Sequence, residues 1–509
     1  MMASGLFSRM PSWFIVAALF ASSLIWLPPY PPMLDLPQHA GQVELLRQFW
    51  NGQSSWLPML QINLFTPYLL GDILALVLSV AIPVVWALKL VLTLAFFLFL
   101  LACCLLQNEF GSDPRLKWMF IPAFFSLSYD LGFYPFILAL PIGLFLVLVA
   151  LRYSKQPSMA NGIKLTGIGI LLFFTHGLVF LMACAIGGSM LLVTPALRFR
   201  AKLTSAWPYL MFGILVVAYR LHVHHSAMAP PGYRPLFTWK WDYDRLSFLR
   251  IFWTSDFRGA LLSSVIPVLL ILPRYIGSHF HKSDLAPFIP LIVLLLAYGT
   301  LPSQVQEVSL IYIRFSPYFL PFFVFAFRKP DNDFPSDKAR HPGWFVFLIP
   351  GLSLFIVGIK MFQTANFYRE SQAFGPLMEK AVANQRALSL IFDSGSRYIT
   401  TPMVYLHYPL WYQAEKGGFV DVNFASNPPC VVRFKNDQAP SAVLGFEFRP
   451  TTFDWVKWQG WRYRYFFVRS LLPISQHFFD NPQCKVSIVQ SSGPWSLYES
   501  SCITGKMTQ

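Results

Sequence analysis

Charged side chains are scarce in this sequence: Asp, Glu, Lys and Arg make up 12% of its 509 residues. An average soluble domain carries about 25% charged residues. Hydrophobic residues account for 55% of the chain, the mean hydropathy is +0.49, and the apolar residues come in long blocks. Long apolar blocks indicate membrane spans, so the composition argues against a chain of soluble domains and predicts a polytopic membrane protein.

Common catalytic and metal-binding motifs are also missing. The chain has no Cys-x-x-Cys, His-Glu-x-x-His or P-loop, and no Gly-x-Gly-x-x-Gly between a strand and a helix. Three close histidines, His222, His224 and His225, are a weak metal signal because no carboxylate shell accompanies them. The net charge of +15 is largely explained by cytoplasmic loops in a membrane protein, so we expect no nucleic-acid partner.

Eleven transmembrane helices are predicted from the apolar blocks. The first carries one basic residue before it, Arg9, and no small-residue cleavage site after it, so we interpret it as an uncleaved span with a cytoplasmic N-terminus. Residues 118–128 are apolar but short, and predict a re-entrant or interfacial segment. The predicted spans are residues 12–29, 66–82, 84–106, 131–151, 162–176, 178–196, 206–223, 259–276, 286–301, 309–327 and 343–361.

Basic residues alternate between the predicted loops in the positive-inside pattern. This pattern predicts a bacterial inner-membrane protein, and the odd number of spans places the C-terminus in the periplasm. One outer loop, residues 224–258, breaks the pattern because it carries five basic residues interleaved with aromatic ones. The predicted cytoplasmic loops carry Arg152, Lys155, Lys164, Arg198, Arg200, Lys202, Arg274, Lys282, Arg328, Lys329, Lys338 and Arg340.

The tail, residues 363–509, differs in kind from the predicted membrane domain, residues 1–362. Short alternating runs such as residues 430–434 and 462–468, separated by Pro and Gly, predict a small α/β or α+β domain. The fold class is therefore an all-α membrane bundle followed by a small periplasmic domain.

Cysteine usage agrees with this division. Cys103, Cys104 and Cys184 lie in predicted spans, where cysteine is an ordinary small apolar residue. The tail contains Cys430, Cys484 and Cys502, and an oxidising compartment allows one disulfide among them. The sequence leaves the pairing open.

The predicted first outer loop, residues 30–65, opens with Asp35-Leu-Pro-Gln-His39 and continues into a helix-like segment. Its apolar positions suit a helix that lies in the membrane interface. An Asp followed by Pro commonly caps a helix, and on the loop alone capping is the better interpretation of Asp35. The alternative is that Asp35 overhangs the bilayer rim as a functional carboxylate.

Further polar residues are predicted at the same outer face. Tyr129 and Asp130 precede the fourth span, where Asp130 is again first interpreted as a cap and Gly132 permits a close turn. His176 lies at a tight turn between two spans with apolar neighbours on both sides, so it needs a partner or a function.

Basic candidates follow later in the chain. Glu307 and Arg314 are seven residues apart near the outer end of a span, so they either pair or leave Arg314 for an anion. Arg234 and Arg245 belong to the basic loop 224–258. Anionic lipid headgroups are the simpler ligand for that loop, and a lipid-linked phosphate or pyrophosphate is the more specific one.

These residues resemble, in order and placement, the GT-C glycosyltransferases, integral membrane enzymes that use polyprenyl-phosphate-linked sugars. A group of bacterial GT-C-like proteins is more similar still: it shows a D-x-P-x-H loop, a G-F-x-x-F segment that begins a span, a His at a span turn and an Arg-Phe near a late span. The matching segments here are Asp35–His39, Gly132–Phe136, Thr175-His176, Arg314-Phe315 and, in the tail, Gly417–Phe419, Tyr465–Arg469 and Trp495–Tyr498.

The resemblance implies transfer of a sugar from a polyprenyl-phosphate-linked donor to a periplasmic glycan or lipid-linked acceptor. It implies that Asp35 is the general base with His39 beside it. His176, Arg314 and an Arg of the basic loop would bind the donor phosphate. Many GT-C enzymes place a second acid beside the first-loop acid. Asp35 has no acidic neighbour, which counts against a divalent metal cofactor.

Two other functions fit the same pattern. A non-catalytic GT-C-like subunit of an envelope glycan or secretion assembly would keep the fold without the chemistry. A transporter of lipid-linked sugars should show polar groups at mid-span, whereas those found here gather at one face. The glycosyltransferase hypothesis requires Asp35, His176 and Arg314 to border one outward-facing cavity.

Overall fold

The chain forms two compact units, and each is described by itself. The helical unit comprises Met1–Trp26 and Val91–Phe362, and the mixed unit comprises Leu27–Leu90 and Gln363–Gln509. The predicted boundary after residue 362 therefore coincides with a unit boundary, but residues 27–90 group with the tail rather than with the membrane domain. The computed structural model describes residues 11–52, 54–195, 197–225, 237–241, 245, 252, 257–282, 284–305, 308–329, 344–427, 429–435, 438–440, 442 and 445–502.

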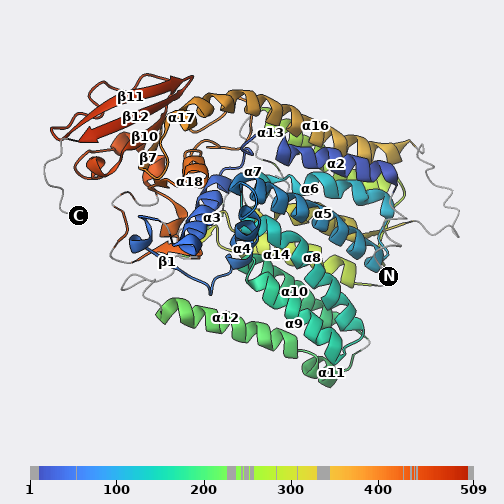
Figure 1. Ribbon diagram of the computed structural model, residues 1–509. Coiled ribbons are helices and arrows are strands. Elements are labelled where there is room, and N and C mark those ends of the chain that lie inside the picture. Colours follow the sequence, from blue (N-terminus) through green and yellow to red (C-terminus); the bar gives the residue numbers. More distant parts are fainter. Residues whose placement is uncertain are drawn as a thin grey trace. The chain divides into compact units, whose positions relative to one another are not determined.

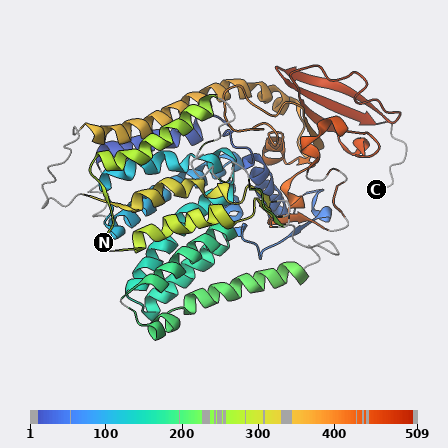
Figure 2. The same ribbon diagram turned by 180° about the vertical axis from the view of Figure 1, so that it is seen from behind.

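Apolar helices dominate the helical unit (Figures 1 and 2). Two of them, α5 and α16, continue across the unit boundary. Short two-residue strands join some of the loops, in the orders β2-β4-β5 and β3-β6. The elements are α2 (Ser12–Trp26), α5 (Val84–Phe110), η2 (Pro114–Met119), α6 (Phe120–Phe124), α7 (Leu127–Asp130), α8 (Tyr134–Lys155), α9 (Met159–Phe173), α10 (Gly177–Val193), α11 (Phe199–Thr204), α12 (Trp207–His225), β2 (Phe237–Thr238), α13 (Phe257–Tyr275), β3 (His279–Phe280), η4 (Ala286–Phe288), α14 (Ile289–Thr300), β4 (Gln304–Val305), β5 (Val308–Ser309), η5 (Ile313–Phe315), α15 (Ser316–Phe325), β6 (Phe327–Arg328) and α16 (Phe345–Ser371).

Three helical stretches are long and apolar enough to cross a membrane: Val84–Phe110, Tyr134–Lys155 and Phe345–Lys380. The other predicted spans each contain a shorter apolar helix of 10–17 residues. The sequence therefore predicted where the apolar helices lie. The lengths of these helices do not establish how many of them are complete spans. A perpendicular span needs about 20 residues.

The helices α5 and α8 end beside each other. The last turn of α5 carries Glu109, which forms ion pairs with Arg152 at 2.8 Å and Lys155 at 3.5 Å, both in the last turn of α8. Near its start, Thr93 accepts a hydrogen bond from the Trp26 indole at the end of α2. The C-terminal ends of α5 and α8 thus lie together, whereas strict alternation of the predicted spans would place them at opposite faces of a membrane.

Residues 112–128 bring the chain back between these two helices. Ser112 donates a hydrogen bond to the carbonyl of Phe325, at the end of α15. Ser128 donates one to the carbonyl of Arg314, just before α15 begins, at 2.5 Å. The segment therefore runs antiparallel to α15 along its whole length, as three short helices, η2, α6 and α7. Its interpretation as a re-entrant or interfacial segment stays a prediction.

The mixed unit is built on a five-stranded sheet in the order β11-β12-β10-β7-β8. Strand β7 pairs in parallel with β8 and β10, while β12 pairs antiparallel with β10 and β11. This mixed sheet is of the predicted α/β or α+β type. The elements are α3 (Leu36–Asn51), η1 (Leu57–Met59), β1 (Leu60–Ile62), α4 (Leu69–Ser79), η6 (Gln372–Phe374), α17 (Gly375–Lys380), β7 (Arg386–Ile391), α18 (Leu410–Lys416), β8 (Phe419–Val420), η7 (Phe424–Ser426), β9 (Val432–Phe434), η8 (Phe446–Phe448), η9 (Pro450–Thr452), η10 (Gly460–Arg462), β10 (Tyr465–Arg469), β11 (Cys484–Ser492) and β12 (Trp495–Cys502).

A disulfide closes the open end of the β11–β12 hairpin. It joins Cys484 to Cys502, which face each other in the strand register. Cys430 remains a buried free thiol. The geometry thus selects one of the pairings that the sequence had left open.

The first loop is an integral part of the mixed unit. Strand β1 pairs antiparallel with β9, which lies in the tail, and α3 packs on α18. A Cβ atom on Gly41 would lie 2.7 Å from the Gln413 amide nitrogen, so a larger residue would have to displace that side chain where the two helices meet. The helix α3 was predicted to lie in the membrane interface; instead most of its residues are buried within this unit.

Buried amide side chains fix α3 to the tail. Gln38 donates to the carbonyl of Val422 and accepts from the backbone N–H of Phe424. The Gln42 side chain accepts from the backbone N–H of Val432. Buried polar groups are tolerated when they are hydrogen-bonded, so these contacts hold the first turn of α3, and with it Asp35, in a defined place.

Candidate active site

Asp35 does not cap the helix that it precedes. Its backbone has φ −94° and ψ −6°, a helical conformation, and its side chain makes no capping hydrogen bond. A capping residue normally has an extended backbone, which turns its side chain back over the first N–H groups of the helix. The capping interpretation of Asp35 was therefore wrong, and the carboxylate needs another explanation.

The Asp35 carboxylate faces a histidine from the tail. Oδ1 lies 3.2 Å from Nδ1 of His407, with the side chains 17% and 8% exposed. The contact is within ion-pair reach but is not aligned as a hydrogen bond, and Nε2 of His407 is buried without a hydrogen-bond partner among the described residues. Asp35 and His407 are thus close, but not all of their hydrogen-bonding atoms are used. This geometry is compatible with proton transfer to a further group.

A second carboxylate completes the cluster. Glu447, in η8, is buried and accepts a hydrogen bond from the backbone N–H of Gly445 at 2.6 Å. Burial raises the pKa of Glu447; nearby His407 and the Gly445 bond lower it, and the charge of Asp35 raises it again. Asp35, His407 and Glu447 are therefore electrostatically coupled, and we call them the acid–histidine cluster.

His39 borders this cluster through a shared aromatic ring. The rings of His39 and His407 lie 5.4 Å and 6.2 Å from the ring of Phe424, both edge-on. His39 follows Asp35 by one helical turn, and its backbone N–H donates to the Asp35 carbonyl. His39 and His407, the neighbour of Asp35, thus pack against the same Phe424 ring. A role for His39 beside Asp35 stays a prediction.

The remaining motifs meet in the helical unit. The Phe136 ring lies 5.1 Å from the His176 ring and 5.6 Å from the Phe315 ring. The guanidinium of Arg314 lies 3.9 Å over the ring of Phe133, and its Nη2 donates to a backbone carbonyl. The G-F-x-x-F, Thr-His and Arg-Phe segments are therefore in contact, and we call them the aromatic–basic cluster.

Local backbone chemistry explains parts of this second cluster. Gly132 has φ +72°, a conformation that favours glycine, as the predicted close turn requires. His176 caps α10: its Nδ1 accepts the backbone N–H of Leu178 at 3.3 Å. The interpretation of His176 as a turn residue is confirmed to that extent, and a second role for its ring stays a prediction.

Asp130 is bound to a lysine rather than capping a helix. Its two carboxylate oxygens lie 2.6 Å and 2.7 Å from the ammonium of Lys360, and both residues are buried. The residue that precedes α8 is Phe133, so the capping prediction for Asp130 was wrong. The neighbouring Tyr129 hydroxyl is buried without a hydrogen-bond partner among the described residues. Asp130 and Lys360 form a buried ion pair within the bundle.

Arg245 was predicted to bind donor phosphate, but its nitrogens contact the protein. They donate to the carbonyls of Lys240, Tyr298, Gly299 and Leu301 at 2.7–3.1 Å. A guanidinium occupied in this way fastens loops together. Glu307 and Arg234 lie outside the described residues.

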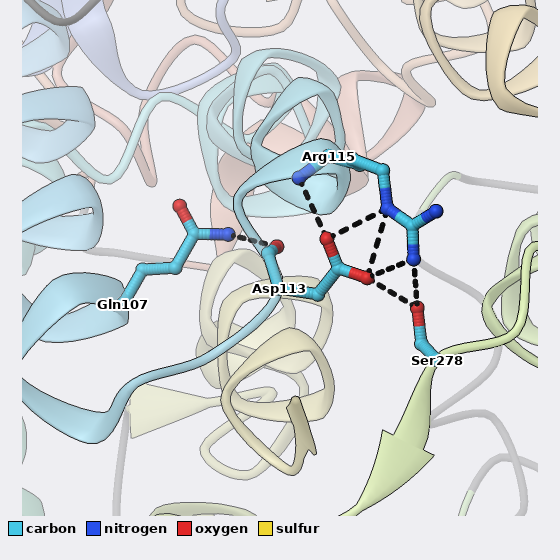
Figure 3. Close-up of polar contacts among 4 residues, drawn as sticks. All are labelled: Gln107, Asp113, Arg115 and Ser278. Atoms are coloured by element: carbon cyan, nitrogen blue, oxygen red, sulfur yellow. Dashed lines mark hydrogen bonds and ion pairs between the residues drawn. The ribbon is translucent and has the colours of Figure 1, made fainter. Parts of the chain in front are cut away.

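Asp113 is an aspartate whose two carboxylate oxygens are both hydrogen-bonded (Figure 3). It accepts from the backbone N–H and the guanidinium of Arg115 and from the hydroxyl of Ser278. Burial alone would raise the Asp113 pKa, but hydrogen bonds from Arg115 and Ser278 outweigh burial and lower it. Both carboxylate oxygens are occupied, so Asp113 is structural.

Sequence reasoning missed His407 and Glu447. A signal existed for His407, because it stands within the apolar and aromatic run Tyr405–Trp411, where a buried imidazole needs a partner. Glu447 gave no comparable signal. No group of three or more His, Cys, Asp or Glu side chains among the described residues could hold a metal ion.

Comparison with known proteins adds no assignment. The chain matches no protein-family model, and no curated protein matches it significantly. The chemistry must therefore be argued from the residues themselves. A carboxylate beside an imidazole, with a second carboxyl whose pKa is raised, can accept, hold and return a proton.

Proposed function

We propose that the protein is an integral membrane glycosyltransferase that moves a sugar from a polyprenyl-phosphate-linked donor to a hydroxyl acceptor, with Asp35 as general base. One observation carries the proposal: Asp35 does not cap its helix and its carboxylate faces buried, incompletely hydrogen-bonded His407. A carboxylate held by the folded tail beside a histidine is what removal of a hydroxyl proton requires.

The reaction would proceed by displacement at the anomeric carbon. The acceptor O–H bond breaks and its proton passes to Asp35, while the oxygen bonds to the sugar. The bond between sugar and phosphate breaks, and polyprenyl phosphate leaves with the electron pair. His407 next to Oδ1 stabilises the ionised carboxylate before transfer and can share the proton afterwards.

The leaving phosphate needs a cation. Arg314 and His176, in the aromatic–basic cluster, remain the candidates, because the structure brings their motifs into contact. Arg245 is no longer proposed, since its donors bind backbone carbonyls.

The membrane topology is proposed in a revised form. We replace the predicted span 66–82 by residues 114–130, because the latter run the length of α15 and the former contains only the 11-residue helix α4. The count of eleven passages and the periplasmic C-terminus are kept. Arg115 and Lys117 then lie at the cytoplasmic end of this span, which strengthens the positive-inside bias.

The test is turnover of lipid-linked sugar by purified protein in bilayer nanodiscs, starting from radiolabelled polyprenyl-phosphate sugars and the envelope glycans of the source cell. Asp35→Asn should lower the rate by about 10²–10⁴-fold, the usual contribution of a general base. The matched control is Asp480→Asn, which alters an exposed Asp–His pair of the same unit, 67% and 83% exposed.

A second outcome would favour the non-catalytic subunit. If the cell's glycans depend on the protein but Asp35→Asn supports them as well as the unmodified chain, Asp35 is structural and the catalytic proposal is wrong. Equal loss in the Asp35→Asn and Asp480→Asn variants would count against it as well.

A further inference from the structure

An apolar groove lies between α10 and α12 of the helical unit (these helices are labelled in Figure 1). Its volume is about 680 Å³, within the range of small-molecule sites. None of its described lining residues is charged; they are Phe180, Leu181, Cys184, Ala185, Gly188, Ser189, Leu192, Tyr209, Phe212, Gly213, Val216 and Val217.

Small residues create this groove. On α10, Ala185, Gly188 and Ser189 share one helix face, and Gly213 faces the groove from α12. A Cβ atom added at Gly213 would meet nothing within 4 Å, and one at Gly188 would meet only the Tyr209 ring at 4.0 Å. The space is therefore open rather than filled by neighbouring side chains.

One end of the groove is basic. Lys202, in α11, donates to the backbone carbonyl of Leu192, whose side chain lines the groove. Exposed Arg198 directly precedes this short helix, and exposed Arg200 lies within it. Phe199 and Leu203 are four residues apart on it and 74% and 60% exposed, so α11 has the composition of a segment at a membrane interface.

We infer that this groove binds a bilayer phospholipid with an anionic headgroup, its acyl chain between α10 and α12 and its phosphate beside α11. The apolar lining recognises the chain and the basic end recognises the charge. In the proposed orientation this end faces the cytoplasmic leaflet, where anionic lipids are found. The inference concerns a different ligand from the sugar donor; it rests on the proposed membrane orientation but not on the proposed transfer of a sugar.

The experiment is native mass spectrometry of the full chain in detergent, with phosphatidylglycerol or phosphatidylcholine of identical acyl chains added. We expect phosphatidylglycerol to remain bound at least several-fold more than phosphatidylcholine. Gly213→Leu should lower retention of both lipids several-fold by filling the groove. The joint change Arg200→Gln and Lys202→Gln should lower phosphatidylglycerol to the level of phosphatidylcholine.

The matched control is Gly167→Leu, at an exposed α9 glycine outside the groove whose Cβ would also meet nothing within 4 Å. Glycine replacement by leucine favours a helix, so both leucine variants should fold. Equal retention of the two lipids by the unmodified protein would overturn the inference. So would equal lipid retention by the Gly213→Leu and Gly167→Leu variants.

Discussion

Asp35 and Asp113 begin with the same local sequence signal and end in opposite roles. Each precedes a helix with proline in its first turn, and each would be assigned as a cap. Asp113 has an extended backbone, φ −62° and ψ 113°, and caps; Asp35 has a helical one and does not. The backbone of the residue before the helix therefore decides whether its carboxylate is used locally or remains for chemistry.

The side chains that contact Asp35 and Asp113 increase the difference between these two carboxylates. Asp113 is held by Arg115 and Ser278, which satisfy both oxygens. Asp35 meets His407, brought to it by the docking of α3 on the tail. A saturated carboxylate is a poor base because its lone pairs are occupied, whereas a carboxylate with one loosely aligned partner can accept a proton.

Serine at either position gives the largest expected contrast. Asp35→Ser should lower sugar transfer by about 10²–10⁴-fold because the base is lost. Asp113→Ser keeps a capping hydroxyl and should leave the rate per folded molecule within about threefold. The measurement is initial rate in nanodiscs, normalised to folded protein. An equal loss in both variants would show that the two carboxylates do not differ in the proposed way.

The loss of stability should follow the reverse order: it should be larger for substitution of Asp113 than for substitution of Asp35. Asp113→Asn removes the partner of Arg115, whose side chain is 26% exposed, so we expect a loss of about 2–3 kcal/mol, below the range for fully buried pairs. Asp35→Asn should change stability less than Asp113→Asn does, because Asp35 makes no aligned hydrogen bond to His407. Thermal unfolding in detergent checks both, and a more destabilised Asp35→Asn would identify Asp35 as structural.

The sequence predicted the apolar helices and the mixed fold of the tail, because each rests on a local pattern. The roles of Asp35, His176 and Arg314 also come from local motifs, and they stay predictions. The sequence could not predict the partner of Asp35, since His407 comes from another part of the chain and is placed by tertiary packing. It also did not predict that residues 112–128 run antiparallel to α15, because proline and short helices break the apolar run of these residues.

His407 should contribute less than Asp35. We expect His407→Gln to lower the maximal rate by about 10–100-fold, since the base survives but loses the neighbour that stabilises its charge. The distinguishing measurement is the maximal rate per folded molecule, which a purely structural role of His407 would leave unchanged. An unchanged rate per folded molecule, with a merely reduced amount of folded protein, would assign His407 to packing.

The smallest expected effect is on the pH dependence of stability. The stabilising contribution of Asp113 should increase with pH, and that of Glu447 should decrease with pH. The Asp113 pKa is lowered in the folded state by Arg115 and Ser278. Its stabilisation is therefore complete above the unfolded pKa of about 4 and is lost as pH falls through the lowered folded value. The Glu447 pKa is raised by burial. Glu447 therefore contributes stability below its unfolded pKa, and this contribution is lost as the pH rises through its raised pKa in the folded protein.

Unfolding measured between about pH 3 and about pH 8 separates the two terms. Asp113→Asn should remove a component of stability that grows with pH, and Glu447→Gln should remove one that declines with pH. Glutamine imitates the protonated carboxyl, so the second variant should gain stability relative to the unmodified chain at the upper end of the range. A Glu447→Gln curve parallel to that of the unmodified chain would mean that Glu447 titrates as it does in the unfolded protein. The acid–histidine cluster would then lack the proton-holding carboxyl that distinguishes it from the structural carboxylate of Asp113.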